Sequence, residues 1–157
     1  TCDDGDLTWM RASASMPLVS QPVEIDGYTL LDGGMTDSIP LEFLESQGFA
    51  RNIIILTQPR NYVKKKNALV PLLKIGLKKF PGVAEAMKNR HIIYNRQTEY
   101  VFEQEKKGRV FVICPPESLK ISRTEKNPEE LQRVYDIGRQ TAEKLLENLK
   151  KWMSFGG

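Results

Sequence analysis

The sequence predicts an α/β fold, and two features carry that prediction. Residues 52–57 (Asn-Ile-Ile-Ile-Leu-Thr) hold four consecutive large aliphatic side chains without polar alternation. Such a run is typical of a parallel-sheet strand that is buried on both faces. A strand-like run ending at Leu31 and a helix over about 40–47 precede it, which is the order of a β-α-β unit. We expect a central, mostly parallel sheet flanked by helices, with a helical C-terminus.

Composition excludes several classes of protein. The chain has 157 residues, 40% hydrophobic and 27% charged, which suits about one globular domain. A net charge of +3 is too small to indicate nucleic acid as a partner. Cys2, Cys114 and the single histidine, His91, form neither a disulfide framework nor a zinc motif. We therefore expect no zinc site, and a reducing, cytoplasmic location.

The first forty residues predict a loop, a helix and a hairpin. Residues 1–8 are polar and read as a loop, and 9–16 are small and helix-compatible before Pro17. Asp26-Gly27 lies between the strand-like runs 22–26 and 28–31, which is a strong hairpin signal.

The second half of the chain predicts mainly helices. Pro40 suits the first turn of the helix over 40–47, and Gly48 lies just past its end. Asn127 is a good N-cap for a long final helix, with Pro128 at its first position and Glu130 three residues after the cap. The remaining expected elements are a basic loop over 59–67, helices over 68–79 and 82–106, and a strand over 109–114. Gly108 is expected to end the helix over 82–106.

Asp32, followed by Gly33 and Gly34, is the sharpest candidate for chemistry. A carboxylate at the end of a strand can deprotonate or orient a nucleophile, but Asp-Gly-Gly is also a common turn. The other Asp-Gly dipeptide, at Asp26, already forms the predicted hairpin turn. A hairpin turn therefore does not account for Asp32. The local pattern alone leaves both readings open.

Four other residues have a chemical and a structural reading. His91 is the only histidine, so any Ser-His-Asp triad would need it, yet its place on an apolar helical stripe favours a packed, hydrogen-bonded ring. Asp37 and Ser38 could be catalytic, but they also suit the cap of the following helix. Cys114 ends a strand before two prolines, which favours an inert buried thiol.

The ordered pattern resembles patatin-like phospholipases, most closely the bacterial branch of that family. The resemblance lies in Arg11-Ala-Ser-Ala-Ser-Met-Pro17, the hairpin, Leu31-Asp32-Gly33-Gly34 and Asp37-x-x-Pro40, and it continues through Arg90-His91-x-x-Tyr94-Asn95 and the last helix. It implies that residues 1–115 are the C-terminal part of the catalytic domain and that 116–157 are an extension with a long amphipathic helix.

The family implies a lipid acyl hydrolase with a Ser–Asp dyad and no cofactor. The dyad aspartate maps onto Asp32, and Gly33 and Gly34 are the motif glycines. The family's serine lies in a Gly-x-Ser-x-Gly elbow, which does not occur in residues 1–157. We therefore expect a fragment that is inactive alone, whose partners are a lipid ester substrate and a missing N-terminal half. Self-association through exposed strand surface is also expected.

A non-catalytic module that binds anionic lipid surfaces is the alternative function. Lys64–Lys66 and the lysines of 74–79 surround the aliphatic residues of 69–77, and such a segment can contact a membrane surface peripherally. A solvated helix face explains the same pattern. No run approaches the roughly 20 apolar residues of a membrane span.

Overall fold

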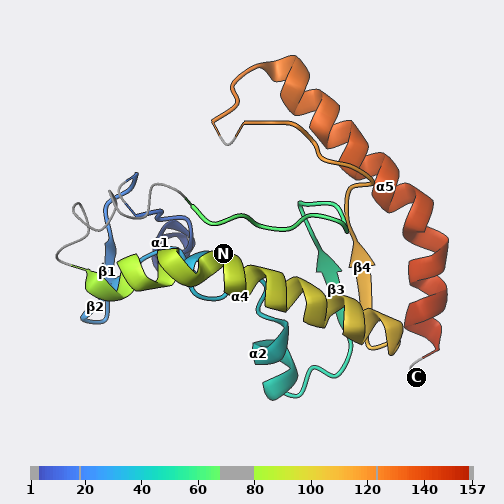
Figure 1. The fold of residues 1–157 in the computed structure, drawn as a ribbon, viewed down its shortest axis with the longest axis horizontal. Coiled ribbons are helices and arrows are strands. Elements are labelled where there is room, and N and C mark those ends of the chain that lie inside the picture. The colour runs from blue at the N-terminus through green and yellow to red at the C-terminus, as the bar shows by residue number, and fades with distance from the viewer. Residues whose placement is uncertain (1–3, 18, 68–79, 123, 156–157) are drawn as a thin grey trace. The chain divides into compact units, whose positions relative to one another are not determined.

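The computed structural model describes residues 4–17, 19–67, 80–122 and 124–155. The chain is mixed α/β and divides into two compact units (Figure 1). Unit 1 comprises Thr1–Pro40 and Lys64–Thr98, and unit 2 comprises Leu41–Val63 and Glu99–Gly157. Helix α4 (Pro81–Lys106) contributes to both units. The predicted helix over 68–79 lies outside the described residues.

Unit 1 begins with helix α1 (Asp4–Ser13), followed by strands β1 (Val23–Ile25) and β2 (Tyr28–Leu30). The expected loop over 1–8 is therefore wrong from Asp4 onward. Helix α1 also ends earlier than predicted, at Ser13, and the N–H groups of residues 14–16 form turn hydrogen bonds after it.

The predicted hairpin is confirmed. Strands β1 and β2 pair antiparallel, with Ile25 opposite Tyr28. Asp26 and Gly27 both have positive φ, 52° and 80°. Two consecutive left-handed residues make the turn that matches the natural twist of a hairpin, and Asp-Gly tolerates them well. This turn accounts for Asp26 structurally.

Unit 2 contains helix α2 (Leu41–Ser46), strands β3 (Asn52–Ile55) and β4 (Val110–Ile113), and helix α5 (Pro128–Ser154). Strands β3 and β4 pair parallel, with Asn52 opposite Val110 and Ile55 opposite Ile113. The helix predicted over 40–47, the strand over 109–114 and the parallel pairing are confirmed. Gly48, with φ of 92°, follows α2 as predicted.

The sheet differs from the prediction in two respects. The described residues form two separate two-stranded sheets, because β2 pairs only with β1 across its tight turn and does not join β3. The parallel crossover runs from β3 through α4 to β4. Strand β3 is also not buried on both faces, since Ile53 is 45% exposed and Ile55 is 73% exposed. Alternate side chains of a strand face opposite sides, so one face of β3 is partly uncovered.

The long helices end and begin on predicted signals. Helix α4 is followed by Gly108 at φ of 74°. The Asn127 side chain accepts a hydrogen bond from the N–H of Glu129 at 3.0 Å, as expected of the N-cap of α5. Glu125, rather than Glu130, completes this cap, because its carboxylate accepts the N–H of Asn127 at 2.9 Å. Glu130 instead pairs with Arg133 at 2.7 Å.

Helix α5 is held at its C-terminal end by Trp152. Its indole N–H donates to the carbonyl of Gly108 at 2.9 Å. The guanidinium of Arg51 lies 3.9 Å from the centroid of the indole ring and donates to the carbonyls of Trp152 and Met153. None of the described residues of α5 is fully buried, and these contacts tie its C-terminal end to the rest of unit 2.

Candidate active site

Asp32 lies directly after β2 and caps the short 3₁₀ helix η1 (Gly33–Met35). Its carboxylate Oδ1 accepts the N–H of Gly34 at 2.7 Å. Among the described residues no hydrogen-bond partner is found for its second oxygen, Oδ2, and the side chain is half-exposed. The carboxylate is therefore fixed on one side and open on the other, which suits a group that accepts a proton.

The backbone of Asp32 is tied to the end of α1. Its N–H donates to the carbonyl of Ser15 at 2.9 Å. Ser15 is 3% exposed, and its hydroxyl donates to the carbonyl of Arg11 at 2.7 Å. Ser15 therefore holds the start of the Asp32 loop through its carbonyl, and its hydroxyl is engaged in the turn after α1.

The two motif glycines have different surroundings. A Cβ on Gly34 would lie 3.0 Å from Oδ1 of Asp32 and 3.8 Å from Nη2 of Arg90. A Cβ on Gly33 would meet nothing within 4 Å. Gly34 therefore gives the carboxylate room to reach its backbone N–H, whereas nothing within the described residues requires a glycine at position 33.

Asp37 and Ser38 do not cap α2, so that expectation is wrong. The hydroxyl of Ser38 donates to the carbonyl of Gly34 at 2.7 Å. The carboxylate of Asp37 accepts from the side-chain amide of Gln97 at 2.5 Å. Both side chains are engaged within unit 1, where they brace the loop that begins at Asp32.

Helix α4 supplies residues that sequence reasoning missed. Nε of Arg90 donates to the carbonyl of Gly34 at 2.9 Å, and Gln97 holds Asp37 at the other end of the same loop. The signal that could have found them is their spacing. Seven residues apart on a helix, they lie on one face together with Tyr94, which is 9% exposed.

His91 is half-buried, and its Nδ1 is buried without a hydrogen-bond partner among the described residues. The expected hydrogen-bonded ring is therefore wrong for Nδ1.

Cys114 is half-buried at the end of β4, less enclosed than predicted. Burial raises the pKa of its thiol above the ordinary value, and the nearby Arg60 opposes this shift. A raised pKa disfavours the nucleophilic thiolate, in agreement with an inert role.

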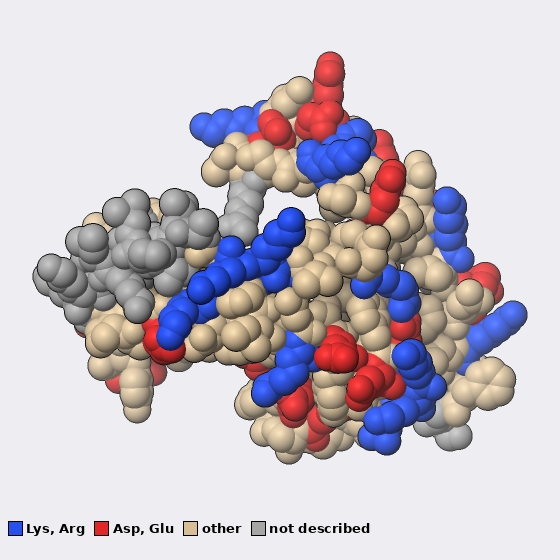
Figure 2. Space-filling view, viewed as in Figure 1, with Lys and Arg blue, Asp and Glu red and all other residues tan. Residues whose placement is uncertain are grey.

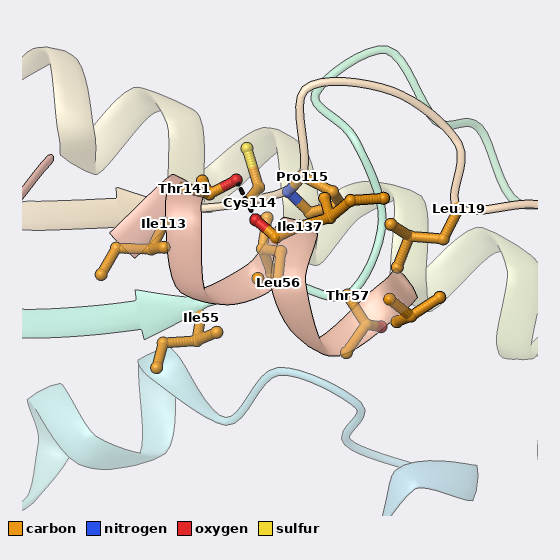
Figure 3. A pocket seen from close by; sticks show the side chains of 11 residues that line it. Ile55, Leu56, Thr57, Ile113, Cys114, Pro115, Leu119, Ile137 and Thr141 are labelled. Atoms are coloured by element: carbon orange, nitrogen blue, oxygen red, sulfur yellow. Dashed lines mark hydrogen bonds between the residues drawn. The ribbon is translucent and has the colours of Figure 1, made fainter. Parts of the chain in front are cut away.

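Cys114 also lines an apolar cavity of about 190 Å³ at the carboxyl ends of β3 and β4. Figure 3 shows Ile55 and Ile113 extending from the two strands and Ile137 from α5. The hydroxyl of Thr141 in its wall is already donated to the carbonyl of Ile137 at 2.7 Å. The described lining residues are mainly apolar and provide no carboxylate or imidazole.

The basic segment is described only up to Asn67. There Lys64 is engaged with α4: its N–H donates to the Asn95 side chain at 2.8 Å, and its ammonium lies 4.7 Å from the centroid of the Tyr94 ring. On the face shown in Figure 2, basic and acidic side chains are interspersed. Within the described ranges, no helix combines the length and hydropathy needed to cross a bilayer.

Comparisons with known proteins give two family matches. Residues 4–44 match the family described as patatin-like phospholipase, and residues 80–154 match the family described as a domain of unknown function (DUF6363). The comparison with curated proteins found no match. The first match contains Asp32, Gly33 and Gly34, and it supports a hydrolase kind of reaction. The N-terminal region of this chain is patatin-like.

Proposed function

We propose that this chain supplies the base of a lipid acyl hydrolase of the phospholipase A or esterase type. In the proposed reaction, Asp32 takes the proton of a serine hydroxyl that lies outside residues 1–157, and the serine oxygen attacks the ester carbonyl. The acyl-serine ester then forms as the alcohol leaves with a proton, and water releases the acid. Residues 1–157 are, on this proposal, the C-terminal portion of a patatin-like fold.

The observation that supports this proposal most strongly is that only one of the two carboxylate oxygens of Asp32 is hydrogen-bonded within the described residues. One oxygen is fixed by the N–H of Gly34 at 2.7 Å, and the other has no partner among the described residues. The loop is anchored to Ser15 on one side and to α4 on the other. An anchored carboxylate with a free oxygen is arranged for proton transfer, and the patatin-like match covers these residues.

The test is Asp32→Asn in the full-length protein that carries this chain. Because general-base catalysis typically contributes about 10²–10⁴-fold, turnover of a short-chain ester should fall at least about 100-fold. Labelling of the serine by a fluorophosphonate probe should fall in parallel. Unchanged thermal unfolding would show that the loss is chemical.

Asp26→Asn is the matched control. It changes the other Asp-Gly dipeptide, in an exposed turn where Asn tolerates the positive φ equally well. It should leave hydrolysis unchanged. Near-normal turnover of the Asp32→Asn protein, or equal losses in both variants, would remove Asp32 from the mechanism.

A further inference from the structure

The part of α4 that belongs to unit 1 holds the Asp32 loop at two points. Arg90 donates from Nε to the carbonyl of Gly34 at 2.9 Å. Gln97 donates from its amide to the carboxylate of Asp37 at 2.5 Å. The two side chains are seven residues apart, which places them on the same face of the helix. The five residues after Asp32 are thus held at both ends by one rigid element.

Gly34 connects the Arg90 contact to Asp32, because it is hydrogen-bonded to both residues. Its N–H is the group that fixes Oδ1 of Asp32 at 2.7 Å, and its carbonyl is the group that Arg90 holds. The hydroxyl of Ser38 reaches the same carbonyl at 2.7 Å. With its carbonyl held by two donors, Gly34 has little freedom to turn its N–H away from the Asp32 carboxylate.

The burial of Gln97 indicates that its polar contact matters more than its packing. The residue is 8% exposed, and its Oε1 is buried without a hydrogen-bond partner among the described residues. An unsatisfied buried amide oxygen costs stability, so an apolar side chain would serve the core better at this position. What an apolar side chain could not provide is the donor that reaches Asp37.

The contacts of Arg90 and Gln97 join residues that match two different families. The Asp32 loop lies within the patatin-like residues 4–44, whereas Arg90 and Gln97 lie within residues 80–154, which match the domain of unknown function. We propose that α4 of this domain is the positioning element of the Asp32 loop, acting through Gly34 and Asp37. The inference rests on the proposed function of Asp32 and gives the domain a specific role beside it.

The decisive experiment reverses the hydrogen bond between Gln97 and Asp37 in the full-length protein. Gln97→Glu sets two carboxylates against each other and should lower kcat about tenfold or more with little change in KM, because small misplacements of a catalytic group are costly. Asp37→Asn combined with Gln97→Glu restores a donor and an acceptor in exchanged positions. This double variant should recover kcat to within about threefold of the natural protein.

Lys88→Gln is the control on the same helix, since Lys88 lies near the same turns and its contact within the described ranges is an exposed pair with Glu85 at 3.3 Å. It should leave kcat unchanged. A general weakening of the fold would not be rescued by exchanging the two groups. The proposal for the Gln97 contact would be overturned if Gln97→Glu kept the full kcat, or if the double variant had a kcat no higher than that of Gln97→Glu alone.

Amide hydrogen exchange at Gly34 provides a readout that does not depend on activity. Arg90→Met should free the Gly34 carbonyl and accelerate exchange of its N–H, whereas Arg90→Lys, which keeps a donor, should restore part of the protection. Equal protection in all three proteins would overturn the positioning role of Arg90. If Asp32→Asn remains active while Arg90→Met accelerates exchange, the proposed function fails and the positioning of the loop stands.

Discussion

Replacing Trp152 with alanine should detach the C-terminal end of α5. The indole donates to Gly108 at 2.9 Å, lies 3.9 Å from the Arg51 guanidinium, and packs on Phe111 with ring centroids 5.9 Å apart. A net hydrogen bond is worth about 0.5–1.5 kcal/mol, an exposed cation–π contact about 0.5–1, and an aromatic pair about 0.5–1.5. The ring is half-exposed, so values toward the lower ends apply and give about 2 kcal/mol.

Amide hydrogen exchange of the full-length protein, followed by mass spectrometry, measures this loss directly. Because 1.4 kcal/mol corresponds to a factor of ten, 2 kcal/mol predicts about thirtyfold faster exchange in the last turns of α5. The control is Met153→Ala, since the Met153 side chain is 57% exposed and contributes only its carbonyl to Arg51. Equal protection of α5 in the natural and Trp152→Ala proteins would refute the assignment of this anchor.

Two further predictions concern α5. Hydrogen bonds from the N–H groups of Asn127 and Lys126 lower the pKa of the Glu125 carboxyl below its ordinary value. The unfolded chain therefore binds this proton more readily, so the stabilisation is present above the unfolded pKa and is lost as pH falls through the folded pKa. The urea midpoint should fall less steeply with acidification in Glu125→Gln, and identical pH profiles would contradict this. Gly138→Ala should raise stability by about 1 kcal/mol, because a Cβ there meets nothing within 4 Å and glycine is unfavourable within a helix; a lowered thermal midpoint would contradict it.

Signals confined to a few adjacent residues were predicted correctly from the sequence. Asp26-Gly27 specified the hairpin, Asn127-Pro128 specified the start of α5, and Gly108 marked the end of α4. In each case the physical cause is local: a positive φ, a missing N–H or a side-chain cap is a property of the residue itself. The same local information drew attention to Asp32, because its Asp-Gly was not needed for a hairpin.

Everything that required knowing which segments meet was decided by the tertiary structure. Asp37 was expected to cap the helix that follows it, but its carboxylate accepts from the Gln97 amide, sixty residues away. Arg90 belongs to a stretch that carries the family resemblance, but the sequence assigned it no role, and only the structure shows that it donates to the carbonyl of Gly34. The run of aliphatics at 52–57 correctly indicated a parallel strand, yet the cover on its faces depends on what packs there. Sequence alone thus selected the aspartate, whereas the fold determined what holds it in place, because contacts between distant segments are not encoded in any one of them.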